Sequence, residues 1–153
     1  MLDAEIPLAR LFAMAFRALL DRVHEQLAAR GYRDVGSSYG YVLLAARERA
    51  LTGADVAELM GVSKQAASKL IEAMESAGYL SRQEHPDDAR ARLARITPQG
   101  RRLLASVEDI YRELEADWAR IIGASELARL RKNLTRTLRS LHGGELPPVR
   151  PTR

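Results

Sequence analysis

A glycine between two short amphipathic segments is the feature that most constrains the fold of this chain. Residues 54–60 and 64–77 carry apolar side chains at spacings of three and four, as helices do. Gly61 lies between the two segments and Gly78 follows the second, at positions typical of helix ends. Two short helices joined by a glycine-containing turn of about three or four residues predict a helix-turn-helix.

Polar side chains suited to helix caps precede both segments. Thr52 can cap the first helix, and Asp55, three residues later, can complete a reciprocal cap. Ser63 stands directly before the second helix and is also a favoured capping residue. The two helices are therefore expected to begin at Ala54 and Lys64.

The spacing of apolar residues changes from a helical to a strand-like period after the second helix. Residues 79–82 and 91–96 alternate apolar and polar side chains, which predicts two short strands. The polar residues 84–90 between them contain a Pro-Asp turn signal. A helix-turn-helix followed by a hairpin is a winged helix, here over residues 37–97. The predicted fold class is mainly α, of the α+β type, with a two-stranded wing.

Long amphipathic helices are predicted on both sides of the winged helix. Apolar spacings indicate helices over residues 5–29, 38–49 and 98–122, and a final helix that Gly143-Gly144 ends. For the last three of these helices the expected caps are Ser37 or Ser38, Thr97 and Ser125.

The apolar stripes of the terminal helices exceed what a winged helix of this size can cover. Exposed stripes imply a partner, and a symmetric dimer is the commonest solution. Residues 1–36 and 98–143 are therefore predicted to form dimerisation helices. The alternative is that these helices cover one another within one chain, and the two interpretations are compatible. Residues 144–153 carry three prolines and are expected to be a disordered tail.

The composition excludes several kinds of chemistry. The 153 residues are enough for one domain, and they include no cysteine, which excludes disulfides, thiolate metal sites and cysteine nucleophiles. His24, His85 and His142 are too far apart in the sequence to suggest a metal site. No phosphate-binding loop or catalytic motif is recognisable. We therefore expect no catalytic residue, no metal and no cofactor, and a protein that is not an enzyme.

Charge and hydropathy indicate the surroundings of the protein. The net charge is +4, which suggests a polyanionic partner without establishing one. Asp3 and Glu5 stand where a secretory signal would be basic, and no apolar run approaches the length of a membrane span. A cytoplasmic protein without a membrane partner is therefore expected.

The start of the second helix of the helix-turn-helix carries hydrogen-bond donors and no acidic residue. A recognition helix enters the major groove with its N-terminus first, so donors are expected there. Lys64 and Gln65 can read guanine and adenine edges, while Ser63, Ser68 and Lys69 can bind phosphates. The alternative is a solvated helix face with a serine cap. The wing that follows at the right distance favours contact with duplex DNA.

Arginines mark the tip of the predicted wing. Arg90 can insert into a narrow minor groove, where the negative potential is enhanced, and Arg92 follows on the same hairpin. Asp88 would repel phosphate unless it is engaged, so it is expected to hold the Arg90 guanidinium by a charge-assisted hydrogen bond. The alternative is an ordinary polar hairpin loop.

Residues 37–102 resemble the winged-helix core of the MarR (multiple antibiotic resistance regulator) family. The segments that carry the resemblance are LTGADVAELMGVSKQAASKLIEAMESAGYLSR and HPDDARARLARITPQG. The second contains an Asp-x-Arg wing, in which Arg90 corresponds to the family's minor-groove arginine and Asp88 to its partner. With the outer helices, the resemblance covers about residues 5–142. Gly40 departs from the helix formers that the family usually has there.

The resemblance implies a homodimeric transcriptional regulator that binds a pseudo-palindromic operator, commonly as a repressor. It also implies a small aromatic or phenolic effector that releases DNA. Aromatic side chains that can line an effector cavity, or that pack in the core instead, are Phe16, Tyr39, Tyr41, Tyr111 and Trp118.

The alternative function is a winged-helix module that binds protein without specific DNA binding. Such a module would show apolar or acidic residues on the recognition face, where this chain has Lys64, Gln65 and Lys69.

Overall fold

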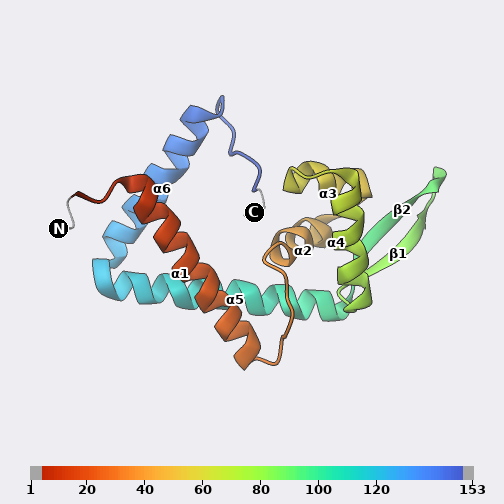
Figure 1. Ribbon diagram of the computed structural model, residues 1–153, viewed down its shortest axis with the longest axis horizontal. Coiled ribbons are helices and arrows are strands. Elements are labelled where there is room, and N and C mark those ends of the chain that lie inside the picture. The colour runs from red at the N-terminus through yellow and green to blue at the C-terminus, as the bar shows by residue number, and fades with distance from the viewer. Residues whose placement is uncertain (1–4, 150–153) are drawn as a thin grey trace.

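The computed structural model describes residues 5–149, which form six helices and a two-stranded antiparallel sheet that projects from one end of the molecule (Figure 1). The elements in chain order are α1 (Leu8–Ala29), α2 (Tyr39–Glu48), α3 (Gly53–Met60), α4 (Lys64–Ser76), β1 (Leu80–His85), β2 (Asp88–Ile96), α5 (Pro98–Ile122) and α6 (Ala124–Leu141). This order of elements is a winged helix flanked by long helices, which confirms the predicted fold class.

The helix-turn-helix is built by the local signals that its sequence contains. The Thr52 hydroxyl accepts a hydrogen bond from the Asp55 backbone N–H at 3.1 Å, and the Asp55 carboxylate accepts one from the Thr52 N–H at 2.8 Å. Gly61 ends α3 in the left-handed conformation, at φ +63°. The Ser63 hydroxyl then accepts from the Ala66 N–H at 3.2 Å and caps α4. The capping predictions for both helices are confirmed.

The wing is longer than the sequence predicted. Leu80 pairs with Ile96 and Glu84 with Arg92, and the register shifts once before His85 pairs with Asp88. The predicted loop 84–90 therefore contributes to both strands. The outer part of the hairpin projects away from the helices (Figure 1), so both of its faces are solvated and an alternation of apolar residues is not required there.

The hydrophobic core lies between the winged helix and the first half of α5. Its largest fully buried side chains are Val42, Leu43, Val56, Met60, Met74, Leu80, Leu103 and Ile110. Gly100 lets the start of α5 approach the wing, because a Cβ there would lie 2.2 Å from the Tyr79 carbonyl oxygen. The Thr97 hydroxyl caps α5 at the Gly100 N–H and donates to the Gly78 carbonyl. The wing and α5 are thereby joined without a flexible linker.

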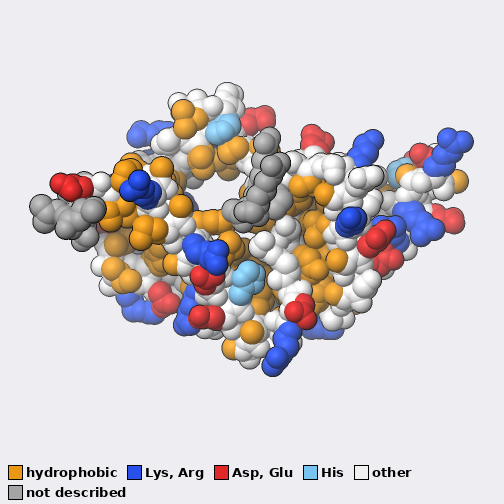
Figure 2. Space-filling view, in the orientation of Figure 1, with side chains coloured by type: hydrophobic (Ala, Val, Ile, Leu, Met, Phe, Trp, Pro, Cys, Tyr) orange, Lys and Arg blue, Asp and Glu red, His pale blue; other side chains and the backbone are white. Residues whose placement is uncertain are grey.

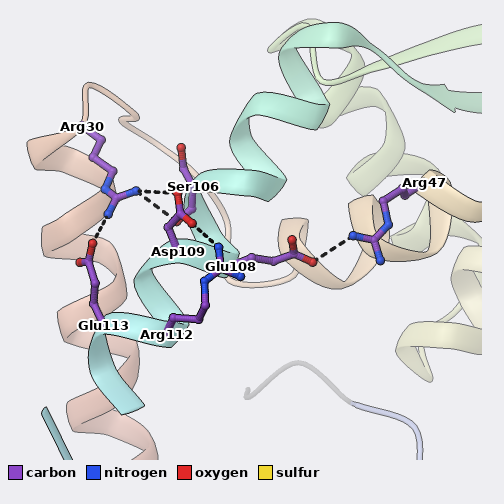
Figure 3. A network of polar contacts seen from close by, with 7 residues as sticks. All are labelled: Arg30, Arg47, Ser106, Glu108, Asp109, Arg112 and Glu113. Carbon is purple, nitrogen blue, oxygen red and sulfur yellow. Dashed lines mark hydrogen bonds and ion pairs between the residues drawn. The ribbon is translucent and has the colours of Figure 1, made fainter. Parts of the chain in front are cut away.

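Arginine–carboxylate pairs connect α5 to α2 and to the residue that follows α1 (Figure 3). Arg30, just after α1, donates to Glu113 at 2.8 Å and lies 3.8 Å from Asp109. Arg47 of α2 donates to Glu108 at 3.1 Å. These pairs are half-exposed, so each contributes little stability alone. They lie where α1 and α2 pack against α5.

The terminal helices leave much apolar surface uncovered. Helix α6 turns back from α5 at Gly123 and contains no buried residue. Large apolar side chains are exposed on α1, at the end of α5 and on α6: Leu8, Leu11, Phe12, Met14, Phe16, Ile121, Ile122, Leu138 and Leu141. Figure 2 shows hydrophobic side chains exposed over α1 and over neighbouring parts of α6.

Four helix-boundary predictions were wrong, and one of them is the start of α3, which lies at Gly53 and not at Ala54. The predicted helix over residues 5–29 begins at Leu8, because Pro7 occupies its N-cap position. Ser38 precedes α2 with helical backbone angles and makes no side-chain cap. Gly123, not Ser125, precedes α6, which starts one residue before the serine.

The end of the chain is described in part. Residues 146–149 form neither helix nor strand. The remainder of the predicted tail, residues 150–153, lies outside the described residues. Among residues 5–149, no helix is both long and apolar enough to span a membrane.

Candidate nucleic-acid interface

The exposed face of α4 carries the five donors that the sequence singled out. Ala67, Ile71 and Met74 bury the opposite face of the helix against the core. The five donors, counted from the capping residue onward, are all exposed: Ser63, Lys64, Gln65, Ser68 and Lys69. The cap of α4 already uses the Ser63 hydroxyl as an acceptor.

Four cations near α4 and on the wing have no ionic partner. Within residues 5–149, Lys64, Lys69, Arg90 and Arg92 make no ion pair, although arginines elsewhere in the molecule are paired repeatedly. Figure 2 shows Lys and Arg side chains along the wing at the right-hand edge of the molecule. Unpaired, exposed cations on adjacent elements create a positive potential that attracts a polyanion.

At the tip of the wing, the structure differs from the predicted contact between Asp88 and the Arg90 guanidinium. The Asp88 carboxylate instead accepts a hydrogen bond from the Arg90 backbone N–H at 2.9 Å. An Asp side chain commonly bonds the backbone two residues on in a tight turn. In the described chain, Asp88 therefore fixes the backbone beneath Arg90 and leaves its guanidinium free.

A cleft of about 450 Å³ lies between α4, the wing and the start of α3. Four of the predicted DNA-binding residues line it: Lys64 and Ser68 from α4, and Arg90 and Arg92 from β2. Arg82 and the first residues of α3 also line the cleft. Within the described chain, none of the lining residues is acidic. Residues that are distant in the sequence thus form one basic cleft.

The sequence did not identify Arg82. The residue lies on β1, and its Nε is 3.0 Å from Glu75 Oε2 on α4. In the sequence, Arg82 is a polar position in a strand that alternates apolar and polar residues. Any solvated strand position has this pattern, so the sequence did not distinguish Arg82. Its place in the cleft depends on how the wing packs against α4, which is a tertiary property.

A second cavity lies between the long helices. It has a volume of about 420 Å³ and is mostly apolar, and four of the five predicted aromatic residues line it: Phe16, Tyr41, Tyr111 and Trp118. Leucines of α1 and α6 form its walls. Arg131 of α6 and Glu115 of α5 pair at 2.5 Å at its edge. Burial raises the pKa of the Tyr111 phenol, and the nearby Tyr41 phenol raises it further.

Tyr39 is not part of this cavity. Its side chain is buried in the core and meets Tyr79 edge to face, with ring centroids 6.0 Å apart and planes at 67°. The prediction that Tyr39 lines the pocket was therefore wrong. Helix α2 directs Tyr41 toward the cavity and Tyr39 toward the core because residues two apart lie on different faces of a helix.

The described residues contain no group of three His, Asp or Glu side chains that could hold a metal ion. The candidate site therefore consists of the exposed face of α4, the wing and the basic cleft between them. These define the chain as a winged helix-turn-helix protein.

The comparisons with known proteins narrow this class. Residues 37–91 match the family model of the MarR family. The HTH-type transcriptional regulator BilQ of Clostridioides difficile is 25% identical over 103 residues, which is 67% of this chain and 70% of BilQ. The match of the winged-helix residues to this family model confirms the resemblance that the sequence predicted.

Solved structures share the fold over most of the chain. A mutant of MarR from E. coli superposes with a TM-score of 0.71 at 23% identity, covering 87% of this chain and 97% of that one. A mutant of MepR from S. aureus, solved bound to an oligodeoxyribonucleotide, superposes with a TM-score of 0.61 at 22% identity, covering 90% and 99%. The long helices are therefore part of the shared fold, in addition to the winged helix.

Proposed function

We propose that this protein is a dimeric, sequence-specific DNA-binding transcriptional regulator that represses from a pseudo-palindromic operator. The observation that carries the proposal is the exposed, acid-free start of α4 beside a wing with unpaired arginines. A partner rich in phosphate fits this surface, whereas a protein partner would favour apolar or acidic groups. The DNA-bound structure of MepR supports the same use of this fold.

The side chains divide by what they can contact. Lys64 and Gln65 lie in the first turn of α4 and read base edges in the major groove. Ser68 and Lys69 bind phosphates one turn later. The Ser63 hydroxyl stays with the helix cap, so this residue contributes through its position at the positive end of the helix.

The wing supplies the minor-groove contact. Arg90 inserts there and Arg92 binds the adjacent backbone. Asp88 acts on Arg90 through the backbone hydrogen bond at the tip, which holds the turn in one conformation. Its negative charge is thereby kept within the turn instead of facing phosphate.

The long helices bring two winged helices together. Residues 1–36 and 98–143 form the dimerisation part and residues 37–97 the DNA-binding part. The exposed apolar side chains of α1 and α6 support this division, because a second copy would remove them from water. Two-fold symmetry then places the recognition helices about one helical turn apart on DNA, with half-sites about 10–10.5 base pairs apart.

The apolar cavity is the proposed effector site. Its volume of about 420 Å³ lies in the range of small-molecule sites, and Phe16, Tyr41, Tyr111 and Trp118 supply aromatic surface. A small aromatic or phenolic molecule would contact α1, α2, α5 and α6 at once. Since α2 belongs to the winged helix, such a ligand can bias the position of the DNA-binding part.

Selection from random duplexes tests the function. The wild-type chain should enrich a pseudo-palindrome, and Lys64→Ala and Gln65→Ala should each flatten the base preference by about 1–3 kcal/mol at one position per half-site. Lys69→Ala should weaken binding to all duplexes alike, because a phosphate contact carries no base information. Lys132→Ala on α6 removes the same charge outside the proposed DNA-contacting surface and serves as the control.

Two results would contradict the proposal. One is a failure to enrich any sequence. The other is an unchanged base preference in both the Lys64 and the Gln65 variants.

A further inference from the structure

Arg82 is held in the basic cleft by one side of its guanidinium. Its side chain is 25% exposed, and its Nε lies 3.0 Å from Glu75 Oε2. This contact is an ion pair without the alignment of a hydrogen bond, so the buried Glu75 Oε2 has no hydrogen-bond partner among the described residues. Within residues 5–149 the terminal nitrogens Nη1 and Nη2 have no hydrogen-bond partner. A guanidinium anchored at Nε presents its remaining donors as a planar fork, which matches the geometry of a phosphate.

The surroundings of this fork favour an anion. Lys64 and Ser68 from α4 and Arg90 and Arg92 from β2 line the same cleft. On its third side, α3 begins at Gly53, and the first N–H groups of a helix have no partner inside the helix. Four cationic side chains and the start of α3 therefore line one space of about 450 Å³.

Nearby carboxylates are already engaged. The Asp55 carboxylate accepts from the Arg49 guanidinium at 2.9 Å and from the Thr52 N–H at 2.8 Å. The Glu75 carboxylate pairs with Arg82 itself. No acidic side chain of the described chain lines the cleft, so the positive charge of the other three cations is not offset there.

We propose that Arg82 binds one backbone phosphate of duplex DNA between the recognition helix and the wing, with Glu75 as the positioning residue that orients its guanidinium. This inference rests on the proposed function and adds a contact that joins the two DNA-binding elements. A DNA phosphate is favoured over a free anion because the elements on both sides of the cleft are the two proposed to contact the duplex. Arg82 serves affinity and register, since a phosphate contact reads no base.

The experiment compares salt dependence among variants at Arg82 and Glu75. Arg82→Gln should lower the slope of log affinity against log salt by about one unit and weaken binding roughly tenfold at 0.1 M salt. The loss should be the same for the selected operator and for a random duplex. Arg82→Lys should restore the slope, because it keeps the charge, and Glu75→Gln should leave the slope unchanged, because the cation remains. Arg136→Gln on α6 is the matched control.

The possible outcomes separate this inference from the proposed function. If the wild-type chain binds duplex DNA and Arg82→Gln keeps the wild-type slope, the phosphate contact is wrong although the regulator is not. An equal loss of affinity in Arg82→Gln and Glu75→Gln, with both slopes unchanged and both thermal midpoints lowered, also overturns it, since the pair would then be structural. A wild-type chain that binds no duplex overturns both proposals. Inorganic phosphate that protects Arg82 from a guanidinium-modifying reagent as well as duplex does would show a free-anion site instead.

Discussion

The two ends of this molecule bury their apolar side chains to different degrees. At the winged-helix end, residues 37–110, side chains such as Leu43 and Met60 are almost completely enclosed. At the terminal-helix end, formed by α1, residues 111–122 and α6, Ile121 is 82% exposed and α6 buries nothing. Both ends have regular apolar spacing. The difference shows that an amphipathic pattern specifies a helix face but not whether its own chain covers that face.

The largest expected effect comes from placing a charge on the uncovered face. Leu138→Asp should weaken dimerisation by roughly a hundredfold or more, about 3 kcal/mol, because the partner would bury an unpaired carboxylate. Operator binding should fall with it, while each chain stays folded. Sedimentation velocity measures the first effect and anisotropy with labelled duplex the second.

Ser140→Asp is the control for this variant, because it adds the same charge on the polar side of α6. If Leu138→Asp sedimented as the wild type does, α6 would not form the dimer interface, and the contrast between the two ends would need another explanation.

A cavity in the core of the winged-helix end should lower the stability of the fold, whereas the charge on α6 should lower dimerisation. Leu43→Ala removes a fully buried side chain and should lower the free energy of unfolding by about 2–5 kcal/mol. Leu44, next to it on α2, is 44% exposed, so Leu44→Ala should cost less than about 1 kcal/mol. Urea unfolding measures both. Equal losses in the two variants would mean that α2 packs differently.

Two glycines test how closely the base of the wing and α2 pack against α5. At Gly100 an added Cβ would lie 2.2 Å from the Tyr79 carbonyl oxygen, so Gly100→Ala should destabilise the fold by about 1–3 kcal/mol. At Gly40 the nearest atom, Val107 Cγ1, would be 3.5 Å away, an ordinary contact. Gly40→Ala should therefore stabilise α2 by up to about 1 kcal/mol. Opposite signs in thermal unfolding are expected, and like signs would contradict this account.

The smallest effect concerns pH and the cap of α3. The Arg49 hydrogen bond lowers the pKa of Asp55 to about 2, against burial, and the Thr52 N–H also lowers it. Because the folded pKa lies below the ordinary value of 3.8, the ionised carboxylate stabilises the fold above about pH 4. That contribution is lost as the pH falls toward 2.

Asp55→Asn should therefore cost about 1 kcal/mol near pH 7. Its difference from the wild type should shrink between about pH 4 and pH 2. Urea unfolding over this range, with Asp87→Asn at the wing turn as control, measures the effect. A difference that stayed constant down to pH 2 would show that Arg49 and Thr52 do not lower the pKa of this carboxyl.

Local signals in the sequence predicted the winged helix well. The reciprocal cap of Thr52 and Asp55, the turn at Gly61 and the cap at Ser63 each depend on residues within four positions, so short-range chemistry determines them. The start of α5 at Pro98 follows from the same kind of signal, since proline has no N–H to lose at a first helical position.

The features that the sequence did not predict depend on tertiary contacts. Tyr39 and Tyr41 are both aromatic residues on α2, and only the position of the neighbouring helices decides which one faces the core. Arg82 reaches the cleft because β1 packs against α4 through Glu75. The length of the wing was underestimated because a strand solvated on both faces carries no apolar period.

The junction at Gly100 makes α5 a lever. Its 25 residues span about 37 Å, and its first turn is packed against the base of the wing. A tilt of about 5° at the far end, where the terminal helices meet, would displace the wing by about 3 Å over this length. That distance approaches the rise of one base pair, about 3.4 Å. In the proposed dimer on DNA, a modest change of angle at the terminal-helix end would thus be enough to move the two wings out of register with their grooves.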